Sequence, residues 1–189
     1  MYLPAQCSLI GSFVVLCCLS VGCSKGPKDI TPTDLRVVNV GDGWYELSTA
    51  RGGFKALFPG KPTMQTNRVG LPGGGSLDQY FLVFELSGTV AFGLLFHSFD
   101  RLDPDRALPD ACRAVSRDAK IISERDIVVS GVSGREMVME KVGGAALVSA
   151  RVYVRDNIVY MISSIVPVEK PRADETAKFL QSFTFLDRP

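Results

Sequence analysis

Residues 146–166 read ALVSARVYVRDNIVYMISSIV, and the pattern of this stretch decides the fold. Its first half alternates apolar residues with more polar ones, whereas its second half, from Ile158 to Val166, is apolar at nearly every position. Alternation is typical of a strand with one buried face, and a short continuous apolar run indicates a strand buried on both faces. Asp156-Asn157 between the halves is a turn signal. The stretch therefore predicts an antiparallel hairpin whose second strand is covered on both sides.

Strand patterns continue on both sides of this hairpin. The upstream alternating apolar sets are Phe54, Ala56 and Phe58; Tyr80, Leu82, Phe84 and Leu86; and Val90, Phe92, Leu94 and Phe96. Glycine-containing turns at 133–134 and 143–144 indicate further strands near 121–130, 135–142, 146–155 and 158–166. Short turns join antiparallel neighbours. Residues 44–186 are therefore predicted to hold at least six antiparallel strands.

Two segments break the strand pattern. Near residues 109–119, Leu108, Ala111, Cys112, Val115 and Ala119 recur at spacings of three and four, and near 171–183 the residues Ala173, Ala177, Leu180 and Phe183 do the same. Such spacing places apolar side chains on one side of a helix. Each helix must bury that side, so the predicted fold class is α+β, a mainly antiparallel sheet covered by two helices, in a single globular domain over residues 44–189.

Several segments together resemble small exported bacterial proteins of the PsbP-like fold family. They are GFKALFPGKP at 53–62, GVSGRE at 131–136, RVYV at 151–154, IVY at 158–160 and FLQSF at 179–183. The resemblance covers most of residues 44–186 and implies α/β/α layers. It also implies a role in binding or assembly rather than catalysis, and it supplies no catalytic residue to carry over.

The N-terminal segment resembles a bacterial lipoprotein signal. An uncharged apolar run from Cys7 to Val21 ends at the sequence SVGCSK, residues 20–25. The run is shorter than the roughly 20 residues that span a bilayer and fits the apolar region of a signal peptide. We expect residues 1–22 to be a signal peptide, Cys23 to be acylated, and residues 23–43 to hold the acylated cysteine and a flexible tether. An unlipidated signal and a retained membrane helix are the alternatives.

This address predicts a protein of the cell envelope that is anchored in a membrane by its N-terminal lipid and faces the extracytoplasmic side. The charge composition of the sequence indicates no further partner. The chain has 21 basic and 20 acidic residues and a net charge of +1, with no basic stripe for phosphate contacts, so we expect no nucleic acid. Outside residues 1–23, Cys112 is the one cysteine of the sequence, and His97 is its one histidine. We therefore expect no internal disulfide, no metal and no cofactor.

For each residue that could carry out chemistry or bind a ligand, a structural role is favoured over a catalytic or binding role. His97 could be a general base, but no nucleophile motif accompanies it, so a hydrogen-bonded structural histidine is favoured. Cys112 lies on the apolar side of its helix and is predicted to be buried. The glycine-rich loop at 70–76 lacks the Gly-Lys-Ser/Thr ending of a phosphate-binding loop. The carboxylates of Asp100, Asp103, Asp105 and Asp110 could bind calcium, but capping of the first helix is favoured.

Three functions remain open from the sequence. The leading hypothesis is a non-enzymatic, lipid-anchored protein that docks another envelope protein, and the candidate partner-binding face is Arg151, Tyr153 and Arg155 on one strand face. A second is a small-molecule carrier with an aromatic-lined pocket formed by Tyr80, Phe81, Phe84, Phe92 and Phe96. A hydrolase built around His97 is the third. No catalytic site is expected.

Overall fold

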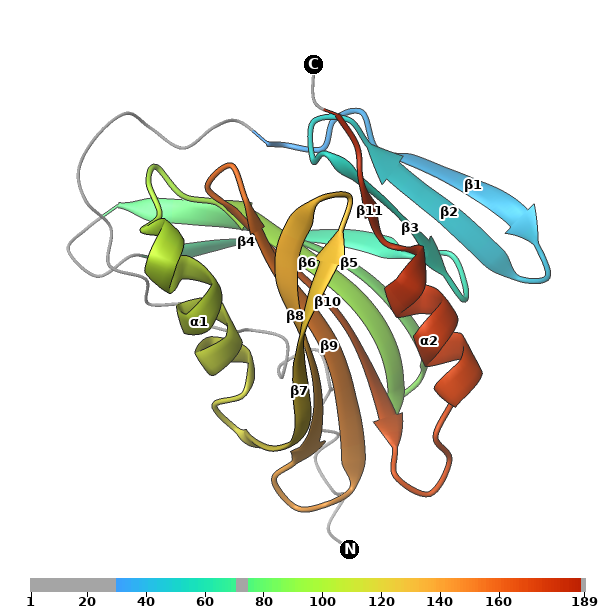
Figure 1. The fold of residues 1–189 in the computed structure, drawn as a ribbon. Helices are drawn as coiled ribbons and strands as arrows, with labels where there is room; N and C mark the ends of the chain where they lie inside the picture. The colour runs from blue at the N-terminus through green and yellow to red at the C-terminus, as the bar shows by residue number, and fades with distance from the viewer. Residues whose placement is uncertain (1–29, 71–74, 188–189) are drawn as a thin grey trace, which may run out of the picture.

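The computed structural model describes residues 30–70 and 75–187, which form two antiparallel sheets and two helices (Figure 1). The strands and helices are β1 (Arg36–Gly41), β2 (Trp44–Thr49), β3 (Phe54–Phe58), β4 (Thr63–Gly70), β5 (Ser76–Ser87), β6 (Val90–Ser98), α1 (Pro104–Val115), β7 (Ala119–Val129), β8 (Val132–Lys141), β9 (Ala146–Arg155), β10 (Ile158–Pro167), α2 (Ala173–Ser182) and β11 (Thr184–Phe185). The small sheet has the order β1-β2-β3-β11, and the large sheet has the order β4-β5-β6-β10-β9-β8-β7.

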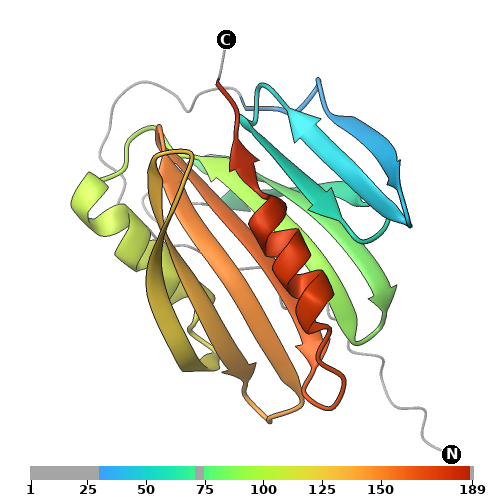
Figure 2. The ribbon, with the colours of Figure 1, turned by 45° about the vertical axis from the view of Figure 1, so that its right-hand side comes forward.

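The elements form three layers, and the large sheet is the middle layer (Figure 2). The small sheet and α2 cover one face, and α1 covers part of the other. Each interface has its own apolar core, and both cores take residues from β5, β6, β9 and β10. The predicted α+β class, with a mainly antiparallel sheet and two helices, is confirmed.

The hairpin that the sequence predicted lies at the centre of the large sheet. β10 pairs with β6 on one side and with β9 on the other, and every residue from Ile158 to Val166 is buried. Asp156 and Asn157 adopt φ values of 53° and 63°, the left-handed conformation that a two-residue hairpin turn requires. The apolar run of β10 is therefore explained by cover on both faces.

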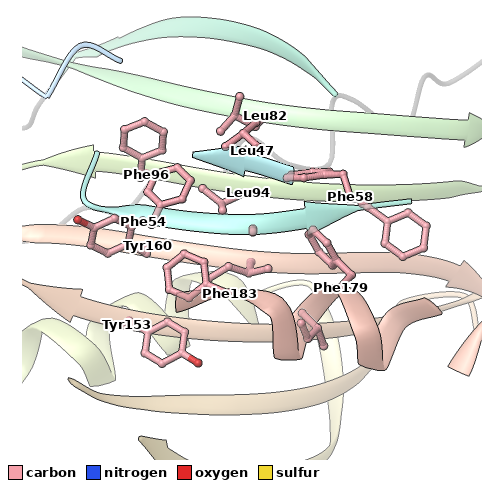
Figure 3. Close-up of a cluster of buried hydrophobic side chains, with 14 of the residues drawn as sticks. Leu47, Phe54, Phe58, Leu82, Leu94, Phe96, Tyr153, Tyr160, Phe179 and Phe183 are labelled. Carbon is pink, nitrogen blue, oxygen red and sulfur yellow. The ribbon is translucent and has the colours of Figure 1, made fainter. Parts of the chain in front are cut away.

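Aromatic rings fill the core between the two sheets (Figure 3). Phe54 of the small sheet meets the edge of Phe96 of the large sheet, with ring centroids 5.1 Å apart, and stacks on Phe183 at 5.8 Å. The hydroxyl of Tyr160 donates to the carbonyl of Gly52 over 2.8 Å. Edge-to-face and offset contacts of this kind add to the free energy gained from burial. They bind the small sheet firmly to β6 and β10.

The boundaries of the helices differ from those predicted. α1 starts earlier than residue 109 because the Asp103 carboxylate accepts from the amide of Asp105 over 3.0 Å and Pro104 occupies the first turn. It ends at Val115, and Ala119 already belongs to β7. α2 spans Ala173–Ser182, close to the predicted 171–183.

The predicted tether over residues 23–43 is also different in its second half. Residues 36–41 form β1 in register with β2, so that Val37 lies opposite Leu47. Ile30 is only 4% exposed, and the Thr31 hydroxyl lies 2.9 Å from the hydroxyl of Tyr80. The ordered domain therefore includes residues from Ile30 onward. The apolar side chains at 30 and 37 are too few to show a periodic pattern, which is why composition alone suggested a tether.

A substitution at Gly134 tests how tightly β8 packs against β9. A Cβ atom at this position would lie 2.3 Å from the ring of Tyr153 and 2.6 Å from the backbone oxygen of Val152. We expect Gly134→Ala to lower the free energy of unfolding by about 2 kcal/mol, because the backbone oxygen cannot move aside cheaply. Urea unfolding followed by circular dichroism measures this loss.

Gly88→Ala is the matched control. Nothing lies within 4 Å of a Cβ atom there, and Gly88 is exposed in the turn between β5 and β6. Its free energy of unfolding should stay within about 0.5 kcal/mol of the original value. Equal effects of the two substitutions would contradict the described packing of β8 on β9.

Candidate functional site

The candidate partner-binding face on β9 is buried. Arg151 is 9% exposed, Tyr153 is fully buried and Arg155 is half-buried. α2 and β11 cover this face of the strand (Figures 1 and 2). The sequence-based assignment of an exposed docking set is therefore wrong, because the polar residues of β9 face the C-terminal segment rather than solvent.

Arg151 links the sheet to the end of α2. Its Nε donates to Oε2 of Glu136 over 2.6 Å, and its Nη1 donates to the carbonyl of Leu180 over 3.0 Å. Glu136 also accepts from Nε of Arg125 over 2.7 Å. Burial acts to raise the pKa of Glu136, but the hydrogen bonds from Arg151 and Arg125 outweigh it and leave that pKa lowered. The guanidinium of Arg151 also satisfies a carbonyl in the last turn of the helix, where a positive charge is favourable.

Tyr153 and Arg155 hold the residues that follow α2. The ring of Tyr153 stacks on Phe183 with centroids 5.4 Å apart. Arg155 donates from Nη1 to the carbonyl of Leu186 over 3.1 Å, and its guanidinium lies 5.4 Å above the ring of Phe185. Together, Arg151, Tyr153 and Arg155 fasten the C-terminal segment to the large sheet. The signal that could have indicated this role is the apolar pattern of residues 179–185, which requires a sheet face to bury it.

His97 lies on the other face of the large sheet, in β6. It is fully buried, and burial lowers its pKa to about 4. Its ring meets the edge of Phe99 with centroids 4.9 Å apart. Within the described residues, neither ring nitrogen has a hydrogen-bond partner, so the expected hydrogen bonding of a structural histidine is wrong.

The surroundings of His97 do not supply catalytic partners. A cavity of about 10 Å³ borders the ring. Its other lining residues are Leu95, Val152, Val159 and Met161 from the sheet and Ala111 and Val115 from α1. None of these carries a hydroxyl, thiol or carboxylate that His97 could activate. The described part of the chain therefore gives a hydrolase around His97 no support.

The aromatic residues proposed for a carrier pocket are divided between the two faces. Tyr80, Phe92 and Phe96 belong to the core beneath the small sheet, and Phe81 belongs to the core on the opposite face. Phe84 is half-buried, and its ring occupies the space where a side chain at Gly60 would lie. These rings fill cores and do not line a shared pocket.

Other candidate residues also have structural roles or lie outside the described residues. Asp103 caps α1, and Asp110 pairs with Arg113 over 2.9 Å, which confirms capping for Asp103. Cys112 is buried as predicted. Within residues 30–70 and 75–187, no group of three or more His, Cys, Asp or Glu residues is placed to hold a metal ion. Cys23 and residues 71–74 of the glycine-rich loop lie outside the described residues.

The antiparallel large sheet, with the small sheet and α2 on one face and α1 on the other, defines a PsbP-like α+β fold. Among solved structures, the chain is similar to cyanobacterial PsbP (CyanoP) from Synechocystis sp. PCC 6803, with a TM-score of 0.51 and 15% sequence identity. The match covers 78% of this chain and 95% of that one, and at this identity it shows the fold alone. No protein-family model matches the sequence, and a search of curated proteins finds no significant relative.

The buried ion pair of Arg151 can be tested by stability. We expect Arg151→Met to lower the free energy of unfolding by about 3 kcal/mol, because it removes one partner of a buried pair and leaves the carbonyl of Leu180 without its donor. Urea unfolding measures the loss.

Arg125→Ala is the control for this prediction. Arg125 contacts the same carboxylate from the exposed side, with 68% of its side chain accessible, so its removal should cost less than about 1 kcal/mol. If Arg151→Met were as stable as the original protein, Arg151 would not fasten α2 to the sheet.

Proposed function

We propose that this protein is a non-catalytic, lipid-anchored component of a bacterial cell envelope with a role in binding or assembly. The observation that carries the anchoring is the apolar run that ends at SVGCSK, residues 20–25. The PsbP-like fold supports the binding role, and so does the burial of the one histidine among apolar side chains. In the described ranges, no helix has the length and apolar character needed to cross a bilayer.

The length of chain between the anchor and the domain limits where the domain can work. Cys23 is followed by only a few residues before Ile30, which packs in the core beneath the small sheet. A chain of this length reaches at most about 25 Å when fully extended. An acylated Cys23 would therefore keep the domain beside the membrane surface, within reach of partners that are embedded in or attached to the same membrane.

The anchor is tested by substituting the cysteine. We expect the full chain, expressed in a bacterial host with lipoprotein processing, to sit in the membrane fraction and to resist washing with salt, because ions do not screen the burial of acyl chains. Mass spectrometry of its N-terminus should show an acylated Cys23. Cys23→Ser should lose the acyl mass and should not be cleaved by the lipoprotein route.

Cys18→Ser is the matched control, because it removes a thiol from the same apolar run without touching the proposed acylation site. It should keep the acyl mass and the membrane attachment. An unmodified N-terminus after removal of the signal, or retention of Met1, would contradict the lipid anchor. The first result would favour soluble export and the second a retained membrane helix.

The non-catalytic part of the proposal has its own test. His97→Leu keeps a buried side chain of similar reach but removes both ring nitrogens. In a panel of ester, peptide and phosphoester substrates, we expect the original protein and this variant to give the same background rates. A hydrolytic activity that is present in the original and lost in His97→Leu, with the circular dichroism spectrum unchanged, would overturn the proposal.

A further inference from the structure

A row of polar side chains crosses the large sheet from its edge to His97. Val159 lies opposite His97 on β10, and on the other side the register that sets Tyr80 opposite Phe96 brings Gln79 next to His97. Asn67 of the edge strand β4 lies opposite Gln79. Asn67 is exposed, whereas Gln79 is 2% exposed and its Oε1 has no hydrogen-bond partner in the described structure. The row therefore ends at the buried imidazole, and within the described structure neither the Oε1 of Gln79 nor the ring nitrogens of His97 are hydrogen-bonded.

The imidazole at the end of this row lies in an unfavourable place for a charge. Even the neutral ring has a donor and an acceptor that find no partner, which costs free energy in a buried site. The adjoining cavity of about 10 Å³ has room for about one water, but apolar side chains line it and would hold that water weakly. A protonated ring could not be solvated there without movement of a neighbouring element.

Among the described residues, none of those that face the ring from the elements packed against it carries a charge. The facing residues are Gln79 from β5, Val159 and Met161 from β10, Val152 from β9, and Ala111 and Val115 from α1. Cys112 of α1 belongs to the same core and is a thiol, which is uncharged in acid. The carboxylates at α1 lie elsewhere: Asp103 caps the helix, Asp110 pairs with Arg113, and Asp105 is exposed in the first turn. A positive charge on His97 would thus have no compensating partner.

Helix α1 is the element that can move at least cost. Strand β6 is held by ladders to β5 and β10, so it cannot separate without loss of many backbone hydrogen bonds. α1 has 12 residues. Its buried side chains, Ala107, Ala111 and Cys112, are small, and its larger apolar side chains, Leu108 and Val115, are only partly buried against the same core. Little apolar area therefore holds it to the sheet, and the cavity already separates part of it from His97.

We infer that the protonation state of His97 controls the attachment of α1: protonation of the ring releases the helix from the large sheet and uncovers the apolar surface beneath it. The uncovered surface would include Leu95, Val152, Val159 and Met161. Release would thus expose a contiguous apolar patch on the large sheet. Acidification would therefore change the surface of the domain while its sheets stay intact.

The pH window follows from the pKa of His97. Burial lowers this pKa to about 4, whereas an exposed histidine titrates near 6.5. Because the imidazole of His97 binds its proton more tightly in the open form than in the closed form, protonation favours opening. The attachment of α1 is therefore strongest above pH 6.5 and weakens as the pH falls toward 4. Linkage predicts that the equilibrium constant for opening rises roughly thirtyfold between about pH 8 and about pH 5.

Hydrogen exchange of the full chain, followed by mass spectrometry, tests the inference. After correction for intrinsic rates, the amides of α1 should lose roughly thirtyfold of their protection at the lower pH, while those of β6 and β10 keep theirs. In His97→Leu, protection of α1 should be the same at both pH values. An unchanged α1 in the original protein, an equal loss in α1 and the strands, or the same loss in His97→Leu would each overturn the inference.

Two further variants control for folding and for the carboxylates of α1. His97→Gln keeps a polar side chain that does not titrate, so it should behave as His97→Leu does and replaces that variant if the latter does not fold. Asp110→Asn removes the half-buried carboxylate of α1 and should keep the full pH response. A pH response that disappears in Asp110→Asn would assign the effect to the Asp110–Arg113 pair and overturn the role of His97.

Discussion

The structure depends on the burial of β10 on both of its faces. A strand that is apolar at successive positions cannot lie at an edge or on a half-exposed sheet without exposing a full row of side chains to water. β10 therefore takes the middle of the large sheet, and the sheet needs cover on each side. On one side the cover is the small sheet with α2, and on the other it includes α1. The three layers follow from this one requirement.

The C-terminal segment joins the two sheets. β11 adds to the small sheet beside β3, and the amide of Leu186 donates to the carbonyl of Gly53 over 2.9 Å. The same segment is held to the large sheet by Arg151 and Arg155, each of which donates to one of its carbonyls. The hydroxyl of Ser182 accepts from the amide of Leu57 over 2.8 Å, so α2 is also tied to the small sheet. A few polar contacts thus set how two apolar surfaces sit on each other.

The sequence predicted β3, β5, β6, the strands from β7 to β10 and both helices, because their periodic patterns are local; it did not indicate β1, β2, β4 or β11. It could not predict the cover of β9, because Arg151 and Tyr153 look exposed until the segment near Leu180 is placed on them, and that contact joins residues about thirty positions apart. Nor could it predict β1, in which only Val37 is partly buried. The unpartnered ring nitrogens of His97 in the described structure were not predictable either, because they depend on how α1 lies on β8 and β9. Such features are set by tertiary contacts rather than by propensity.

The position of β11 has a consequence for how the chain comes to be folded. The edge strand β11 of the small sheet pairs through residues 184–185 with residues 54–55 of β3, so this strand comes from the C-terminal part of the described domain. Contacts of such large sequence separation form late, since most of the chain must be available before they can be made. A ribosome that still holds the C-terminus would therefore carry an incomplete domain, with the aromatic core under the small sheet open on one side. Folding of this core would be completed only after the C-terminal segment is released.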